Sequence, residues 1–309
     1  MTTATAPTWS DVRFPAMGST ARLLVLGGPP DLPERARARL AWLEARWSRF
    51  EPTSDVSRVN AAGGRPVVVS PETFEVVALA IDCWRATAGA FDPTVLDALE
   101  RVGYDRDFAA VGSSTVDREV PAPARPAPGC AGIELLPRLP AVRLPPGVRI
   151  DLGGIGKGRA ADLLAGELRA AGADGVCVDL GGDVRVTGTA PEPAGWRVLL
   201  DRAVAPHPGF LLAEGGVATS TRLRRRWTRG GTEQHHLVDP ASGDPARTGL
   251  AAVTVVAAHT AGAEVLAKAA FVAGPEAGPE LLRTHGVTGL LVADDGSVRE
   301  LAGLGSFRA

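Results

Sequence analysis

Cysteine is scarce in this sequence, and its scarcity excludes two kinds of scaffold. The three cysteines, Cys83, Cys130 and Cys177, lie far apart and are odd in number, so neither a disulfide framework nor a zinc site is indicated. A long apolar run is also missing, because no stretch approaches the roughly 18 apolar residues that a membrane-spanning helix needs. The first residues carry neither the basic start nor the apolar core of a signal peptide. We therefore expect a cytoplasmic protein without a membrane segment.

An excess of charge of either sign is absent as well. The 309 residues carry a formal net charge of −2, with 22% charged and 45% hydrophobic residues, which is ordinary for a globular protein. Nothing in this balance predicts a nucleic-acid partner. The length is enough for one large domain or two ordinary ones, with a substantial core.

The most informative stretch runs from Ile150 to Gly158 and reads IDLGGIGKG. Its glycines are flanked by a carboxylate, Asp151, and an ammonium, Lys157. Glycine lets the backbone approach another group closely, because it has no Cβ. The following residues have helical periodicity, with an apolar stripe formed by Ala160, Leu164, Leu168 and Ala171. A glycine turn that leads into a helix N-terminus presents unpaired N–H groups, so this stretch predicts a phosphate site.

Two common phosphate motifs do not fit this stretch. In a Walker A loop with Lys157 as its lysine, the first glycine would stand where Asp151 is, and Ser or Thr would stand where Gly158 is. The last position of the dinucleotide fingerprint G-x-G-x-x-G/A requires Gly or Ala, but the sequence has Arg159 there. A tight strand-to-helix turn without any ligand stays open as the alternative.

Hydrophobic periodicity predicts helices and strands along the rest of the chain. Helices are expected at 33–47, 71–89, 158–171 and 261–274. Strands are expected at 21–26, 142–152, 176–180, 184–186, 196–200, 217–219, 234–240, 253–257 and 289–292. Residues 109–132 are rich in Pro, Ala, Ser and Gly, which predicts an insertion or mobile loop.

Arginines and histidines gather between residues 222 and 236. A solvated edge strand, kept from aggregating by its charge, is the favoured interpretation for most of the arginines. These are Arg222, Arg224, Arg225, Arg226 and Arg229. His235 and His236 are adjacent on a predicted strand, so their side chains point to opposite faces and at most one can enter a shared site.

The order of the motifs resembles one known family. The sequence contains, in this order, MGST, WSRFEPTSDVSRVN, FDPT, DLGGIGKG, GGD, TS, HHLVDPASGDP and AEVLAKA. Each piece is unspecific alone, but their joint order from about residue 13 to residue 275 resembles the FAD:protein FMN transferase (ApbE) family. The chain looks like a variant with altered metal-ligand positions.

The resemblance implies an α+β fold with two related layered α/β halves that share one flavin-binding cleft. Residues 1–12 would form an N-terminal tail, and residues 13–309 would form a single unit in which 109–132 is the mobile insertion. The implied enzyme transfers FMN from FAD to a Thr or Ser hydroxyl of a target flavoprotein and releases AMP, with magnesium as its metal. An FAD-binding protein without turnover and an FAD hydrolase that gives FMN and AMP are the alternatives.

The resemblance also implies which residues form the site. Asp151 and Lys157 would contact FAD, and His236 and Val238 would lie beside the flavin phosphate. Met17, Phe50, Ala90, Phe91 and Asp92 would line the adenosine and flavin pocket, although Phe50 alone reads more simply as a plug of the core. Charge on the breaking diphosphate would be neutralised with the help of Lys157. His236, preferred over His235, would accept the proton of the attacking hydroxyl.

The expected metal site departs from the family. Gly154 would offer its carbonyl oxygen to the ion, but the family's Asp and Thr on the later helix are replaced by Glu264 and Lys268. A longer carboxylate can still bind magnesium, whereas an ammonium has no lone pair to give. Two accounts compete: Lys268 takes over part of the cation's role, or Glu264 and Lys268 form an i,i+4 ion pair worth a few tenths of a kcal/mol.

Overall fold

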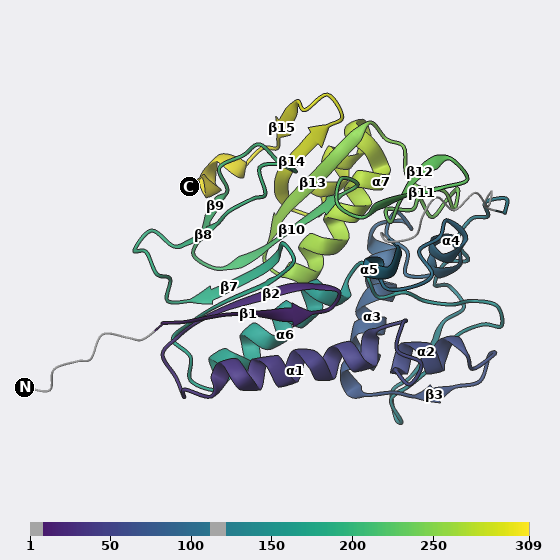
Figure 1. The fold of residues 1–309 in the computed structure, drawn as a ribbon, viewed down its shortest axis with the longest axis horizontal. Helices are drawn as coiled ribbons and strands as arrows, with labels where there is room; N and C mark the ends of the chain where they lie inside the picture. Colours follow the sequence, from purple (N-terminus) through teal and green to yellow (C-terminus); the bar gives the residue numbers. More distant parts are fainter. Residues whose placement is uncertain (1–8, 112–121, 309) are drawn as a thin grey trace, which may run out of the picture.

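One antiparallel sheet of eight strands organises the structure. The computed structural model describes residues 9–111 and 122–308. Neighbouring strands in the sheet follow the order β1-β2-β6-β7-β10-β13-β14-β15 (Figure 1). Their bounds are β1 Trp9–Ala16, β2 Ser19–Leu26, β6 Gly175–Leu180, β7 Asp183–Gly188, β10 Gly215–Thr221, β13 Leu250–Ala257, β14 Thr288–Ala293 and β15 Val298–Glu300.

The sheet divides into two halves that follow one another along the chain. The first four strands come before Gly188 and the last four after Gly215. Helix α6 (Gly156–Ala170) packs on β6 and β7, helix α7 (Thr260–Thr284) packs on β10 and β13, and the two helices contact each other. The α+β class with two layered halves is therefore confirmed.

The two faces of the sheet are buried by different partners. In β13, Val253 and Val255 pack toward α7, whereas Ala252 and Val256 pack in a separate core on the other face. This alternation is the period of two that a strand buried on both faces shows. The second core is covered by the hairpin of β8 (Trp196–Val198) and β9 (Phe210–Leu212) and by the short helix η1 (Leu304–Phe307).

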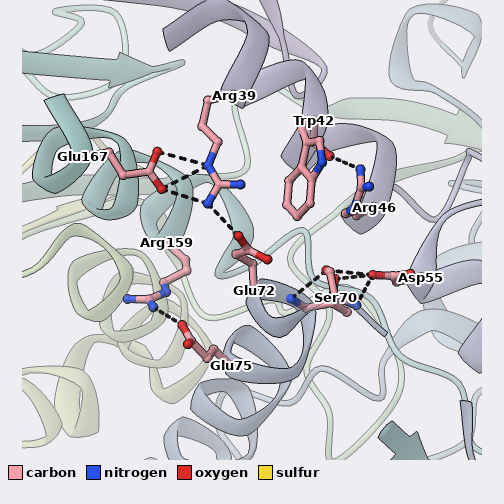
Figure 2. A network of polar contacts seen from close by, with 10 residues as sticks. Arg39, Trp42, Arg46, Asp55, Ser70, Glu72, Glu75, Arg159 and Glu167 are labelled. Carbon is pink, nitrogen blue, oxygen red and sulfur yellow. Dashed lines mark hydrogen bonds and ion pairs between the residues drawn. The ribbon is translucent and has the colours of Figure 1, made fainter. Parts of the chain in front are cut away.

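Helices α1 (Leu32–Trp47) and α3 (Pro71–Ala86) extend the helical layer beside α6 (Figure 1). Arg39 of α1 joins all three, because its guanidinium bonds both Glu167 of α6 and Glu72 of α3 (Figure 2). The N-cap that the sequence predicts at Ser70 is present, since its hydroxyl accepts from Thr73 N at 3.3 Å. The carboxylate of Asp55, in α2 (Asp55–Asn60), in turn accepts from Ser70 N at 2.9 Å.

The remaining helices and strands are short and lie outside the eight-stranded sheet. They include a three-stranded sheet and a two-stranded hairpin. Their bounds are β3 Val67–Val68, β4 Glu134–Leu136, β5 Ala141–Arg143, α4 Leu96–Arg101, α5 Phe108–Val111, β11 Arg226–Arg229 and β12 Thr232–His235. In the part of the chain that the structure describes, no helix combines the length and the hydrophobicity needed to cross a membrane.

Several expected elements differ in extent from those observed. Residues 9–12, expected in the N-terminal tail, form the first half of β1. The strand expected at 142–152 ends at Arg143, because Pro145 and Pro146 follow and proline cannot donate to a ladder. Helix α7 continues beyond residue 274 through a kink at Gly274, whose φ is 84°, a left-handed value that glycine adopts readily.

The expected insertion at 109–132 is only partly described. Residues 112–121 lie outside the described ranges. The described end of the segment is hydrogen-bonded to the body of the protein, with Ala127 N donating to Pro240 O at 2.8 Å and Gly129 N to Thr94 Oγ1 at 2.9 Å. This end therefore lies against the structure close to the segment that follows His236.

Candidate active site

One pocket brings together the residues that the sequence singles out. It lies where the end of α1, the glycine turn before α6, helix α7 and the segment after β12 meet. Of the predicted site residues, it is lined by Met17, Phe50, Ala90, Phe91, Asp92, Asp151, Gly154, Lys157, His236, Val238 and Lys268. The exception is Glu264, which lies behind the pocket wall and contacts Lys157.

The glycine turn leads directly into α6, as the sequence predicts. Asp151 folds the turn by accepting from Gly153 N at 2.6 Å. In the described part of the chain, the backbone N–H groups of Gly154 and Lys157 make no hydrogen bond. Glycine is required at 158, since a Cβ there would lie 2.7 Å from the Cα of Ala261 on α7. The turn thus holds two helices close together and keeps two donors available beside the pocket.

Lys157 is held between two buried carboxylates. Its ammonium pairs with Asp183 at the start of β7 and lies 3.1 Å from Glu264 Oε1. Burial alone would lower the pKa of Lys157, but the two carboxylates raise it above its ordinary value. Burial raises the pKa of Asp183 to about 6, against the opposing effect of Lys157. The charge of Lys157 is therefore already neutralised within the protein.

Glu264 and Lys268 do not form the local ion pair that their spacing allows. Both oxygens of Glu264 turn toward α6, where Oε2 accepts from Gly158 N at 2.8 Å and Oε1 contacts Lys157. The Lys268 ammonium instead lies against Gly154, so close that a Cβ on that glycine would overlap it. Burial lowers the pKa of Lys268, with Glu264 and Asp151 opposing the shift. The i,i+4 ion pair between Glu264 and Lys268, one of the two alternatives considered from the sequence, is therefore not formed.

A divalent ion does not fit the donors found here. Magnesium takes oxygen ligands in octahedral geometry, of which one or two are carboxylates. Both oxygens of Glu264 are engaged, and the ammonium of Lys268 has no lone pair. Among the residues that the structure describes, no group of three or more His, Cys, Asp or Glu side chains is placed to hold a metal. The space beside Gly154 is instead taken by the ammonium of Lys268, a cation that the chain itself provides.

The two histidines diverge, and His236 is the one that lines the pocket. His235 is buried elsewhere, edge-on to Phe271 with ring centroids 6.3 Å apart. Nδ1 of His236 lies 3.4 Å from the carbonyl oxygen of Arg225, which favours a proton on Nδ1 and leaves Nε2 as an acceptor. Burial, and then the charges of Arg225 and Lys268, hold the pKa of His236 well below its usual value. His236 is therefore neutral at pH 7.

A wall of aromatic rings and guanidinium groups completes the pocket, and the sequence did not predict most of it. Nε of Arg49 lies 3.2 Å from Asp151 Oδ2, and the guanidinium is 4.2 Å from the ring centroid of Phe50 and 4.7 Å from that of Tyr104. Arg225 approaches the hydroxyl of Tyr104 at 3.4 Å. Phe50 is thus a pocket residue and not a plug of the core.

Arg225 differs from the arginines around it. Arg222 pairs with Asp294, and Arg224 pairs with Asp201 at the surface, as expected for a charged edge. Arg225 points the opposite way and donates to Gly18 O at 3.3 Å across the pocket mouth. Arg225 is therefore not one of the solvated arginines, and it lies in the turn before β11 and not in a strand.

Rare residue types would have identified more of the site. Of the 33 lysines and arginines in the chain, only Lys157 and Lys268 are lysines, and both line the pocket. Tyr104 is the single tyrosine and lines it too. Trp47 adds a further polar group, because its buried indole N–H has no hydrogen-bond partner among the described residues. A buried donor without a partner is uncommon and indicates a ligand or solvent acceptor.

Comparison with known proteins identifies one family. Residues 17–291 match the ApbE family. The FAD:protein FMN transferase of Treponema pallidum is 29% identical over 267 residues, which cover 81% of this chain and 74% of that protein. The enzyme of the same name from Rhodobacter capsulatus is 30% identical over 319 residues, which cover 96% of this chain and 57% of that one.

Solved structures share the fold. The ApbE protein of Thermotoga maritima superposes with a TM-score of 0.86 and 26% identity, covering 98% of this chain and 100% of that chain. The apo form of Pseudomonas stutzeri flavinyl transferase ApbE has a TM-score of 0.81 and 24% identity, covering 99% and 100%. At that identity the second likeness concerns the fold alone.

Proposed function

The chain belongs to the ApbE family, and from this premise we propose that it is an FAD:protein FMN transferase. The donor is FAD, and the acceptor is a target flavoprotein. We further propose that the acceptor group is a Thr or Ser hydroxyl and that the protein acts in the cytoplasm. One observation supports the assignment: a single pocket gathers a glycine turn with free backbone N–H groups, a neutral histidine and an aromatic wall. The free N–H groups suit the diphosphate of a dinucleotide, the aromatic wall suits its ring systems, and the neutral histidine suits an acceptor hydroxyl.

In the proposed reaction, FAD is cleaved at its diphosphate. The acceptor oxygen forms a bond to the phosphorus of the FMN half, and the bridging P–O bond to the AMP half breaks. The electron pair of that bond leaves on the AMP phosphate, and the hydroxyl proton passes to Nε2 of His236. The low pKa of His236 keeps this nitrogen free of a proton at pH 7, as a general base requires.

The other pocket residues hold the donor in place. Gly154 and Lys157 offer backbone N–H groups to the diphosphate, where charge develops as the bridging bond breaks. Phe50 and Tyr104 line the pocket with the guanidinium of Arg49 over their rings, a surface suited to contact with a planar ring system. We assign Lys157 a positioning role through its side chain, because two carboxylates already neutralise it.

Magnesium, which the family resemblance implies, has no step in this proposal. The donors beside Gly154 do not fit a divalent ion, since Glu264 is engaged and Lys268 is itself a cation. When bound in other proteins, such an ion neutralises diphosphate charge. Here that charge must be met by groups of the chain.

Co-expression with a flavoprotein fragment that carries an acceptor Thr tests the proposal. Intact-mass analysis is expected to show the fragment with one added FMN, and chromatography is expected to show one AMP for each label. His236→Asn should lower the labelling rate by a factor of about 100 or more. His285→Asn is the matched control, because His285 follows α7 and its ring contacts backbone carbonyls of Leu281 in α7 and Ala86 in α3.

Two results would contradict the proposal. Free AMP and FMN without a labelled fragment would indicate an FAD hydrolase. Bound FAD that is recovered intact, with no product after prolonged incubation, would indicate a flavin-binding protein without turnover. Equal labelling rates for His236→Asn and the unsubstituted protein would show that His236 is not the general base.

A further inference from the structure

The ammonium of Lys268 is a cation at the pocket floor that the described protein leaves unpaired. It lies against the backbone of Gly154 and beside the ring of Phe91. Among the residues that the structure describes, none makes a hydrogen bond or an ion pair to it. A desolvated ammonium without a partner is costly, so this position favours an anionic ligand.

The nearby carboxylates do not meet this need, because each is engaged elsewhere. Asp151 holds Arg49 and Gly153 N. Asp183 pairs with Lys157, and Glu264 divides its oxygens between Lys157 and Gly158 N. The two lysines of the chain therefore have different states. Lys157 is neutralised by protein carboxylates, while the charge of Lys268 remains available to the pocket.

Two backbone donors lie next to this charge. The N–H groups of Gly154 and Lys157 belong to the turn that contacts Lys268, and both lack a hydrogen-bond partner in the described chain. An ammonium and adjacent free N–H groups at a helix N-terminus form a site for phosphate oxygens. Trp47, whose buried indole N–H also lacks a partner among the described residues, lines the same pocket.

We propose that Lys268 serves as the cation of this active site, so that FMN transfer proceeds without a divalent metal ion. The inference rests on the proposed transferase function and deepens it. The Lys268 ammonium binds the diphosphate of FAD and neutralises the charge that accumulates when the bridging P–O bond to AMP breaks. The acceptor oxygen replaces that bond, and its proton still passes to His236, so no further reactant is needed.

The first experiment needs no variant. The full-length protein is stripped of metal with EDTA, and FAD binding is followed by the quenching of flavin fluorescence, with and without added MgCl₂. The dissociation constant is expected to change by less than about twofold between the two conditions. Acceptor labelling in EDTA should proceed at the rate measured with magnesium. A calorimetric titration with MgCl₂ alone should give no saturable heat.

Substitutions then identify the cation. Lys268→Met, which removes the charge but retains most of the side-chain length, should weaken FAD binding in EDTA by about tenfold or more. Binding of riboflavin, which lacks phosphate, should change little. Lys268→Arg should retain most of the FAD affinity. Arg159→Met is the control, because Arg159 is on α6 close to the turn but pairs with Glu75 outside the pocket.

The possible failures are distinguishable. Labelling that is abolished by EDTA and restored by magnesium, with Lys268→Met unaffected in FAD affinity, would overturn the role of Lys268 and leave the transferase function intact. A protein that neither binds FAD nor labels the acceptor in either condition would overturn both. A loss of FAD affinity in Lys268→Met that riboflavin shares equally would indicate a disturbed pocket and would also contradict the proposal.

Discussion

Replacing Glu264 with glutamine separates two roles for this carboxylate. As a metal ligand, it would matter to stability only when the metal is bound. As observed, it is 5% exposed, accepts from Gly158 N at 2.8 Å and lies 3.1 Å from the Lys157 ammonium. We expect Glu264→Gln to destabilise the fold in the complete absence of metal.

The magnitude follows from the two contacts. A hydrogen bond to a charged group contributes about 1.5–3 kcal/mol, and glutamine retains one acceptor oxygen for Gly158 N. The ionic contact with Lys157 is lost, although Asp183 still pairs with that lysine. We therefore expect a loss of about 2–3 kcal/mol. For a chain of this size, that corresponds to a fall in Tm of roughly 3–5 °C.

Urea unfolding in EDTA, followed by tryptophan fluorescence, measures this loss. Glu167→Gln is the matched control. Its carboxylate likewise pairs with a cation on another helix, Arg39, but its side chain is 43% exposed. The control should lose less than about 1 kcal/mol. If Glu264→Gln is as stable as the unsubstituted protein in EDTA, and if magnesium stabilises only the protein with Glu264, the carboxylate is a metal ligand and our reasoning is refuted.

Three further predictions concern pH and the pocket wall. Burial lowers the pKa of His235 to about 4; the unfolded chain therefore binds more protons between about pH 6.5 and 4, and acidification through that window should cost at most about 3 kcal/mol. His235→Gln should flatten this part of the pH dependence of urea unfolding, and an unchanged slope would contradict the assignment. Arg225→Gln should weaken FAD binding by about tenfold, or about 1.4 kcal/mol, whereas Arg224→Gln, whose side chain is 64% exposed, should bind as before; equal effects in a fluorescence titration would exclude a specific contact. Trp47→Phe should weaken FAD binding about fivefold, or about 1 kcal/mol, by removing the unpaired indole donor, and an unchanged dissociation constant would show that FAD does not use it.

The elements that the sequence predicts well are those with a regular period. Helix α1 was expected at 33–47 and begins at Leu32, because one apolar stripe and a proline in the first turn define it. The cap of α3 at Ser70 was equally clear. By contrast, the strand expected at 142–152 is mostly irregular, because its apolar residues plug the core between prolines without pairing in a ladder. Apolar content alone does not separate these two cases.

The candidate site likewise contains residues that the sequence predicts and residues that it does not. Residues in or beside glycine-rich and Asp-Pro motifs, such as Asp151 and Asp92, were predicted to line the pocket and do. Tyr104 and Arg225 were not predicted to line it, since they reach the pocket only through tertiary packing of α4 and the β11–β12 hairpin. Hydrophobic periodicity along the sequence does not indicate a tertiary contact of this kind. The single tyrosine is marked in the sequence by its rarity, whereas no feature of the sequence separates Arg225 from the arginines around it.

The most instructive difference is between Glu264 and Lys268. Their i,i+4 spacing favours a pair worth only a few tenths of a kcal/mol at a helix surface. Glu264 is buried, however, and its partner Lys157 lies 107 residues away in the sequence. A buried carboxylate gains far more from a charged partner and a helix N-terminal N–H than from a surface neighbour. Tertiary contact therefore takes Glu264 away from Lys268, and the lysine keeps an unpaired charge beside the turn. The engagement of Glu264 with α6 is thus what leaves the charge of Lys268 available to an anion.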